Sequence, residues 1–198
     1  DWFSQYPNQS PIVPASGQNA LGSLAASAGL LAVICSVMVY VDTRRPLWTP
    51  GATATKFLLT ALILGIPTAL LVSLITAAIN EKLTVHMVMS GYGRTLCRIV
   101  LALVVTKLVL ELSIFAHLRN AQYTPRKRSA LLLSGQLSMT TLRRFFFGAV
   151  GGVALPLVLI AEPSMAATNY HPLFVGAATL LMLGLLMAGE LHERFLFF

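Results

Sequence analysis

The sequence predicts an all-α integral membrane protein, and three observations indicate this fold class. Hydrophobic residues make up 56% of the 198-residue chain and charged residues only 11%, whereas soluble domains carry roughly 25% charged residues. Several apolar stretches are long enough to cross the hydrocarbon core of a bilayer, which is about 30 Å thick. The basic residues behind the net charge of +7 gather in short connections between these stretches. This pattern is typical of membrane topology and anionic headgroups, so nucleic acid is not an expected partner.

We expect a bundle of about five transmembrane helices within residues 20–198. The predicted spans are 20–41, 56–79, 96–118, 145–161 and 172–189. Residues 1–19 contain three prolines and many polar residues, and we expect either an extramembrane loop or the N-terminal remnant of a longer chain. Pro46 is expected to end the first helix, and Pro67 lies inside the second. A proline removes one backbone hydrogen bond at each of these places.

The connections differ in character. Residues 80–94 are predicted to form a loop, because Gly91 and Gly93 flank a tyrosine there. Residues 119–144 form the longest and most basic connection, and Ser129–Met139 within it is predicted to be an interfacial helix or a docking surface. In the fourth span, Gly148 and Gly152 have the GxxxG spacing that lets two helices approach closely.

The distribution of Lys and Arg predicts the orientation. The first and third connections and the C-terminus together hold ten basic residues, against three on the opposite side. Because basic residues favour the cytoplasmic side, we expect the C-terminus and the long basic connection in the cytoplasm. An odd number of spans then leaves residues 1–19 on the other side.

The central span, 96–118, carries two opposite charges near its middle. Lys107 and Glu111 are four residues apart, so they lie on the same face of a helix and are expected to pair. An ionisable residue at this depth costs about 2.5 to 3.5 kcal/mol, and the cost is tolerable when the charges neutralise each other and face other helices. Two interpretations follow: a structural ion pair inside the bundle, or part of a proton path or quinone pocket.

The end of the fifth span is unusually rich in ionisable residues. Glu190, His192, Glu193 and Arg194 follow Gly189, and Glu190 and Arg194 have the spacing of an ion pair along a helix. One interpretation is an interfacial salt-bridge cluster that anchors the helix. The other is a relay in which Glu190 or Glu193, with His192, passes protons to or from a quinone headgroup.

Catalytic motifs and metal-binding spacings are not found in the sequence. Cys35 and Cys97 both fall within predicted spans and do not belong to a metal-binding motif. An iron–sulfur cluster generally needs four ligands, mostly cysteines, so this chain alone is not expected to bind one. We therefore expect no catalytic residue, no metal site and no cofactor bound by the chain alone.

Several segments resemble one family. They are YVDTRRPLW at 40–48, the KxxxE of Lys107 and Glu111, PRKRSALLLSGQL at 125–137, LRRFFFGAVGGVALPL at 142–157 and AGELHERFLFF at 188–198. Together they resemble the membrane-anchor subunits of dimethyl sulfoxide reductase, and the resemblance covers nearly everything after about Leu21. The family has about eight spans, so this chain is similar to the last five.

The resemblance implies a function. The chain would be a non-catalytic anchor in a bacterial or archaeal cytoplasmic (inner) membrane, crossing it several times. It would hold an iron–sulfur electron-transfer subunit that serves a molybdopterin catalytic subunit, and it would exchange electrons with quinol as in anaerobic respiration. The quinol-site His and Glu of the family belong to earlier helices without counterpart here, so we transfer no quinol site.

Within this interpretation the sequence offers two sets of candidate residues. The quinone or proton-path candidates are Lys107, Glu111, Glu190, His192 and Glu193. The candidates for docking a partner subunit are Arg44, Arg45, Arg126, Lys127, Arg128, Arg143 and Arg144.

Two alternatives remain open. In the first, the chain is a subunit of a transporter or channel that moves protons or ions with Lys107 and Glu111, and Pro67 and Pro156 break helices around a midplane site. The sequence shows no internal repeat, which is a feature of many transporters. In the second, the chain is a purely structural assembly subunit.

Overall fold

The structure is a computed structural model, and it describes residues 15–43, 50–79, 84–119, 124–165 and 172–197. All regular secondary structure in these residues is helical, and five helices are long and apolar enough to cross a membrane. The predicted fold class is therefore confirmed. The five candidate spans are Asn19–Asp42, Pro50–Ile79, Val85–Leu118, Ser138–Ala161 and Pro172–Leu196.

The chain divides into two compact units, residues 1–57 and 58–198, which we describe separately. The first unit contains α1 (Ala15–Asp42) and the start of α2 (Pro50–Ile79). Most described side chains of α1 are exposed, as lipid-facing apolar side chains of a membrane helix are. Near its end, the ring of Tyr40 lies 5.1 Å from that of Phe57. Residues 1–14 of the predicted loop 1–19 lie outside the described residues, whereas residues 15–19 are helical, so the prediction was wrong there.

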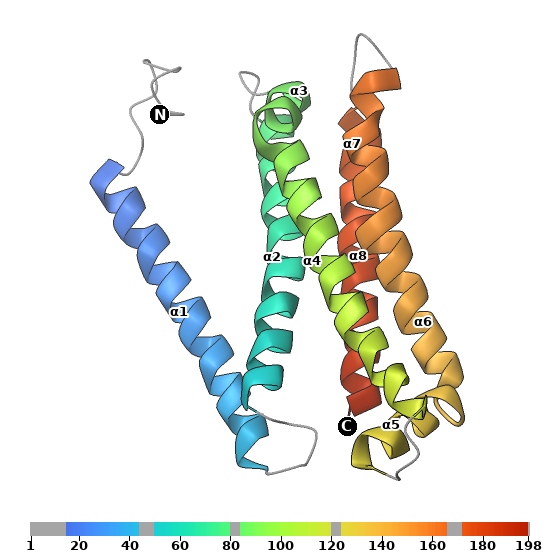
Figure 1. Ribbon diagram of the computed structural model, residues 1–198. Coiled ribbons are helices and arrows are strands. Elements are labelled where there is room, and N and C mark those ends of the chain that lie inside the picture. The colour runs from blue at the N-terminus through green and yellow to red at the C-terminus, as the bar shows by residue number, and fades with distance from the viewer. Residues whose placement is uncertain (1–14, 44–49, 80–83, 120–123, 166–171, 198) are drawn as a thin grey trace. The chain divides into compact units, whose positions relative to one another are not determined.

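In the second unit, the rest of α2 packs with α4 (Arg94–Leu112), α7 (Leu155–Met165) and α8 (Pro172–Phe197) around a shared apolar core. The helix α6 (Ser138–Ala149) packs against α8. A five-residue π-helical segment, η4 (Val150–Ala154), joins α6 to α7 so that they form one continuous span (Figure 1). This span packs against α8 along its length and against α4. The apolar side chains of the unit that are at most 1% exposed include Ile63, Leu70, Met89, Cys97, Val100, Leu159, Val175, Met182 and Leu186.

The third span begins earlier than predicted. Residues from Val85 onward are helical, as α3 (Val85–Val88), the π-helical η2 (Met89–Gly93), α4 and the 3₁₀-helical η3 (Ser113–Arg119). The Thr84 hydroxyl caps the start by accepting a hydrogen bond from the Met87 N–H at 3.3 Å. The prediction of a loop over 80–94 was wrong for this part. Gly93 is buried, and a methyl group there would meet Met89 and Leu70 of α2, so it permits close packing and not a turn.

The fourth span also begins earlier, at Ser138 instead of 145. The short helix before it, α5 (Pro125–Ser134), starts four residues before the predicted segment Ser129–Met139. Its start has a physical cause: the Thr124 hydroxyl accepts from the Lys127 N–H, and Pro125 occupies the first helical turn, where no N–H is needed. The Thr141 hydroxyl of α6 bonds to the Leu133 carbonyl at 3.1 Å, which ties α5 to α6.

The π-helical segment η4 ends at Ala154, two residues before Pro156. A proline lacks an N–H and its ring clashes with the carbonyl four residues earlier, and the wider π turn relieves both problems. The glycines nearby let helices approach as predicted. A methyl group at Gly152 would meet Val104 of α4, and one at Gly151 would meet Leu185 of α8. The span is therefore in close contact with a helix on either side.

The buried stripes of α4 and α8 change from apolar to charged along their length. On α4 the buried residues recur every three or four positions, as on one helix face: Cys97, Val100, Val104, Lys107 and Glu111. On α8 the buried residues follow the same pattern: Val175, Thr179, Met182, Leu186, Glu190 and Glu193. The charges thus continue the core, and α8 runs on to Phe197 instead of ending at the predicted residue 189.

Candidate functional site

Five charged side chains from three helices meet inside the second unit, and we call them the charge cluster. They are Lys107 and Glu111 of α4, Arg144 of α6, and Glu190 and Glu193 of α8. None is more than 7% exposed. Among the residues whose burial the structure describes, these five are the only buried charged ones. Such groups are tolerated in a bundle only when paired and hydrogen-bonded.

Lys107 is fully engaged with the carboxylates of α8. Its Nζ contacts Oε2 of Glu190, and lies 2.6 Å from Oε2 of Glu193. It also donates a hydrogen bond to the Thr60 hydroxyl of α2 at 2.6 Å. That hydroxyl in turn donates to Glu190 Oε2 at 2.7 Å. Each of the three N–H bonds of the ammonium group thus has an acceptor nearby.

Arg144 links α6 to both other helices. Its Nη2 donates to Glu111 Oε1 at 2.8 Å and to Glu190 Oε1 at 3.1 Å, and it lies 3.7 Å from Glu193 Oε2. Two glycines make room for its guanidinium. A methyl group built at Gly148 or Gly189 would come within 3.3 or 2.9 Å of Arg144 Nη1. Glycine at these two positions therefore leaves space for the Arg144 side chain.

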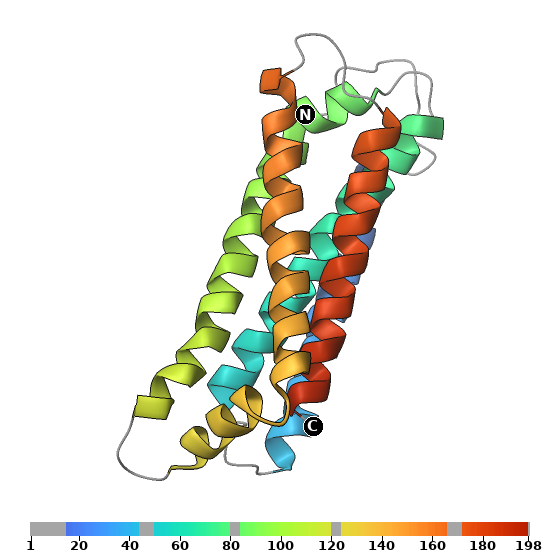
Figure 2. The same ribbon diagram turned by 90° about the vertical axis from the view of Figure 1, so that its right-hand side faces the viewer.

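The charge cluster lies toward one end of the bundle. Arg144 is six residues from the start of α6 at Ser138, or about 9 Å at 1.5 Å per residue. Glu193 is three residues before the end of the fifth span at Leu196. The C-terminus and α5 lie at this same end (Figures 1 and 2). Lys107 and Glu111 lie in the half of the span Val85–Leu118 that ends at Leu118, and their depth in a membrane stays a prediction.

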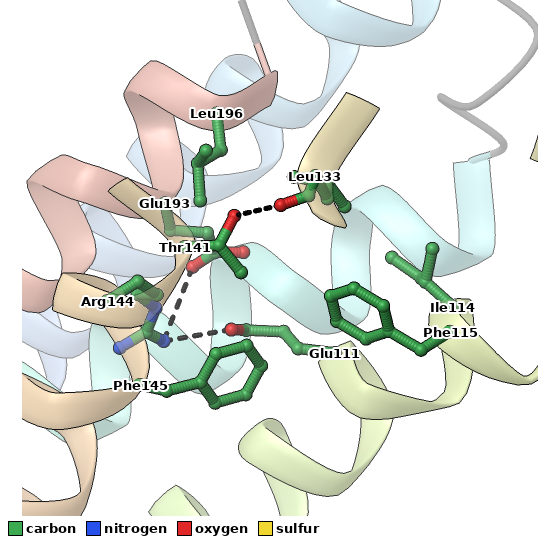
Figure 3. Close-up of a pocket in the computed structure, with 9 residues that line it drawn as sticks. All are labelled: Glu111, Ile114, Phe115, Leu133, Thr141, Arg144, Phe145, Glu193 and Leu196. Carbon is green, nitrogen blue, oxygen red and sulfur yellow. Dashed lines mark hydrogen bonds and ion pairs between the residues drawn. The ribbon is translucent and has the colours of Figure 1, made fainter. Parts of the chain in front are cut away.

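A small pocket adjoins the charge cluster (Figure 3). Its volume is about 20 Å³, which is enough for about one water molecule. Glu111, Arg144 and Glu193 line its charged side, and Phe115 and Leu133 are among its apolar residues. The Nε of Arg144 is buried and has no hydrogen-bond partner among the described residues. A buried donor of this kind usually binds an ordered water.

The predicted pairs along single helices are not the pairs that the structure contains. Lys107 and Glu111 share a face as expected, but Lys107 pairs with α8 and Glu111 pairs with Arg144. Glu190 likewise pairs with Lys107 and Arg144 and not with Arg194. The physical reason is burial, since a buried charge needs a partner across the helix interface, where water cannot reach it.

His192 is not part of the charge cluster. Its Nδ1 donates to the Ala188 carbonyl at 2.8 Å, and its ring lies 5.4 Å from that of Phe147. The hydrogen bond runs to its own helix, so the structure brings Glu190 and Glu193 together with Lys107 and leaves His192 outside.

The predicted docking residues fall into three groups. Arg144 is only 2% exposed, so its assignment to a docking surface was wrong: it neutralises buried carboxylates. Arg128 and Arg143 are exposed and Lys127 is half-buried. Arg44, Arg45 and the Arg126 side chain lie outside the described residues.

Sequence reasoning missed Arg144 and Thr60 as members of this site. A signal for Arg144 was present, because it lies four residues before Gly148, on the face that carries the GxxxG spacing. Thr60 had no such signal, since a threonine in an apolar span most often bonds to its own helix, as Thr68 and Thr76 of α2 do here.

In the part of the chain that the structure describes, no group of three or more His, Cys, Asp or Glu side chains is arranged to hold a metal ion. Comparisons with protein-family models, with curated proteins and with solved structures find no match to this chain. The resemblance to the anchor family thus rests on the quoted motifs alone and stays a hypothesis.

Proposed function

We propose that the chain is a membrane-anchor subunit of a quinol-linked oxidoreductase complex. In this proposal it holds an iron–sulfur electron-transfer subunit against the membrane, and that subunit serves a molybdopterin catalytic subunit. The chain itself contributes to electron exchange with the quinone pool. It carries no catalytic residue of the terminal reaction and sits in a bacterial or archaeal cytoplasmic membrane.

One observation carries the proposal. Three separate segments that carry the family resemblance supply all five members of the charge cluster: Lys107 with Glu111, the Arg144 of LRRFFFG, and the Glu190 and Glu193 of GELHER. These segments lie up to 86 positions apart in the sequence. Three segments whose charges meet in one buried network support the resemblance to the family more than three unconnected matches would.

The chemistry of quinol oxidation suits such a network. Oxidation of a quinol to a quinone releases two electrons and two protons, and the electrons pass to the iron–sulfur partner. The protons need acceptors that connect the membrane interior to water, and buried carboxylates serve this role in membrane proteins. The pocket beside Arg144 is too small for a quinone ring. The charge cluster therefore suits proton handling rather than quinone binding.

A transporter or channel is the weaker candidate. A path across the membrane is expected to have polar groups at several depths, where they replace water around the ion or proton. In the described part of the chain the buried charges gather at one end, whereas the buried stripes toward the other end contain Val100, Cys97 and Val175. This arrangement favours exchange with one side of the membrane.

The proposal is tested by purification from native membranes. The full chain with an N-terminal tag is extracted in mild detergent, and the eluate is analysed for iron and molybdenum and for electron paramagnetic resonance of iron–sulfur clusters. We expect an iron–sulfur protein in stoichiometric amount and oxidation of a quinol analogue by the complex. A chain that elutes in folded form without iron, from membranes that oxidise quinol, would contradict the proposal.

A matched pair of variants localises the docking face. Arg128→Gln with Arg143→Gln removes two exposed charges near α5, and Arg98→Gln removes one exposed charge in α4. If the partner docks at the basic end, only the first variant lowers the amount of co-purified iron, because charges at an interface steer association. Equal losses from both variants would argue against docking at that face.

A further inference from the structure

Two exposed arginines lie inside candidate membrane spans. Arg98 of α4 belongs to the span Val85–Leu118, and Arg143 of α6 belongs to the span Ser138–Ala161. Neither side chain forms a hydrogen bond or an ion pair with a residue that the structure describes. A positive charge on the lipid-facing surface of a span is unfavourable unless an anion neutralises it. The two arginines therefore call for anions from outside the described part of the chain.

Apolar side chains surround Arg143 on the outer face of α6. Met139, Leu142 and Phe146 lie four residues before it, one residue before it and three residues after it. All three therefore lie on or next to the side of the helix that carries Arg143. Their exposed fractions are 62%, 64% and 58%. Acyl chains suit such a surface better than water does, and an arginine among them turns its charged end toward the headgroups.

The outer surface of the third span changes its character at Arg98. Before this residue the exposed side chains are largely polar or small, whereas after it they are largely apolar as far as Leu112. Arg98 thus lies where the lipid-facing surface of the span begins. The exposed residues before it include His86, Ser90 and Thr95, and those after it include Ile99, Val105 and Val109.

The packing of the two helices gives the separation of the two arginines along the bundle. Gly152 of the fourth span faces Val104 of α4, and the two spans run in opposite directions (Figure 1). Arg143 lies nine residues before Gly152, so it is level with about residue 113, nine residues after Val104. Arg98 lies 15 residues before that level, which is about 22 Å at 1.5 Å per residue.

This separation fits the thickness of a bilayer. The hydrocarbon core is about 30 Å thick, so a separation of about 22 Å leaves about 4 Å beyond each arginine. An arginine side chain covers such a distance when it extends from the apolar layer to the headgroups. The whole third span has 34 residues, or about 51 Å of helix, so its length alone does not locate the boundaries. The two arginines do.

We propose that Arg98 and Arg143 each bind the phosphate group of an anionic phospholipid, one at either boundary of the hydrocarbon core. A guanidinium group offers several N–H donors in one plane and forms paired hydrogen bonds with phosphate oxygens. The exposed apolar side chains beside each arginine contact the acyl chains of the same lipid. The inference concerns the chain on its own and does not depend on the proposed redox partner.

A phospholipid suits these positions better than an acidic side chain of another membrane protein. The two arginines lie on different helices and at opposite levels, and each is accompanied by exposed apolar side chains. A bilayer supplies phosphate groups at both levels and acyl chains between them. A protein would have to present one carboxylate at each level, and the match to the bilayer thickness would then be a coincidence.

The assignment also gives the depth of the charge cluster. Arg143 directly precedes Arg144, which pairs with Glu111, so the charge cluster lies close to the boundary that Arg143 marks. Lys107 lies about one helical turn farther into the hydrocarbon core. The first part of the third span, before Arg98, extends beyond the opposite boundary.

Native mass spectrometry tests the lipid sites. The full chain is purified in a maltoside detergent, stripped of lipid and titrated with phosphatidylglycerol. We expect Arg98→Gln and Arg143→Gln each to bind one lipid fewer than the wild type, and the double variant to bind two fewer. Arg98→Lys and Arg143→Lys keep the charge and should retain most of the binding. Both positions are exposed, so all these variants should fold.

A lipid without phosphate is the matched control. Diacylglycerol with the same acyl chains should not bind at either site. Equal numbers of phosphatidylglycerol molecules on the wild type and on the double variant would overturn the proposal, as would equal binding of diacylglycerol. A membrane protein that co-purifies with the wild type and is lost from either glutamine variant would show that a protein supplies the anion, and the lipid assignment would be wrong.

Depth measurements test the two boundaries independently. Spin labels are attached to Ile99→Cys, Val105→Cys and Leu112→Cys, at positions that are 42%, 43% and 51% exposed. The exposed native Cys35 is first changed to alanine, and the chain is reconstituted in phospholipid vesicles. The midpoint between the two boundaries falls near Val105, so its label should lie deepest and the other two at nearly equal depth.

The opposite result is equally clear. If the span Val85–Leu118 were centred in the bilayer by its length, the label at Ile99 would lie much deeper than the label at Leu112, and the boundary assignment would be overturned. Neither experiment uses a partner subunit, so failure here is distinct from failure of the proposed function.

Discussion

Different interactions hold the helices together in the two halves of the same bundle. In the half near α3, the stripes of α4 and α8 bring apolar side chains such as Val100 and Val175 together. In the half near α5, the same stripes bring Lys107, Glu111, Glu190 and Glu193 together with Arg144. The helices and their spacing are continuous between the halves. What changes is whether apolar packing or ion pairs hold the helix interface together.

The difference indicates where substitutions destabilise this fold most. Lipid is as apolar as leucine, so helices in a membrane associate through close packing and hydrogen bonds and not through the hydrophobic effect. In the apolar half, the loss of one side chain leaves a small void. In the charged half, the loss of one charge leaves its partners buried without neutralisation, which costs considerably more. Substitutions in the two halves should therefore differ in size.

The largest effect is expected from Arg144→Met. It removes the cation that pairs with Glu111 and Glu190, and breaking a buried ion pair costs about 3 to 5 kcal/mol. For a chain of this size that corresponds to a fall in Tm on the order of 10 °C. The measurement is thermal unfolding in detergent followed by circular dichroism. The exposed neighbour supplies the control, because Arg143→Met should change the Tm little.

A smaller effect is expected in the apolar half, from Leu159→Ala. Leu159 is fully buried, and removal of its side chain creates a void that costs about 2 kcal/mol, the low end for such changes. The matched change is Leu157→Ala, since Leu157 is 48% exposed and lies two residues away. We expect the control to be near neutral in the same unfolding assay. If Leu159→Ala were as damaging as Arg144→Met, the contrast between the halves would be lost.

The smallest effect is expected where helices touch through glycine. A methyl group at Gly152 would approach Val104 of α4 too closely, and overpacking costs about 1 to 3 kcal/mol. Alanine is also more favourable than glycine in a helix by up to about 1 kcal/mol. Gly152→Ala should therefore lower the free energy of unfolding by about 1 kcal/mol. Gly184 of α8 has open space around it, so Gly184→Ala should be neutral or stabilising. Equal effects of the two changes would contradict the packing described here.

Much of the fold could be predicted from the sequence, because hydropathy and length decide which segments cross a membrane. The number of spans and the interior position of Lys107 and Glu111 follow from these properties alone. Helix starts were harder to predict. Val85 and Ser138 begin their spans inside segments that look like polar or glycine-containing loops, since flanking turns of a membrane helix need not be apolar.

The site was predicted only in part, and for a different reason. The residues Lys107, Glu111, Glu190 and Glu193 could be singled out because charges in apolar helices are rare. Their partners could not, because spacing along one helix says nothing about which helices are neighbours. Arg144 therefore looked like a member of a basic loop until the contacts placed it between α4 and α8.

The central claim, that opposite charges from different helices neutralise one another, is tested most directly by a double-mutant cycle. Unfolding free energies are measured for Lys107→Met, Glu190→Leu and the double variant, which keeps the same net charge as the wild type. We expect each single change to be strongly destabilising and the double variant to recover at least about 1.5 kcal/mol relative to the sum. Strictly additive effects of the two changes would contradict the account.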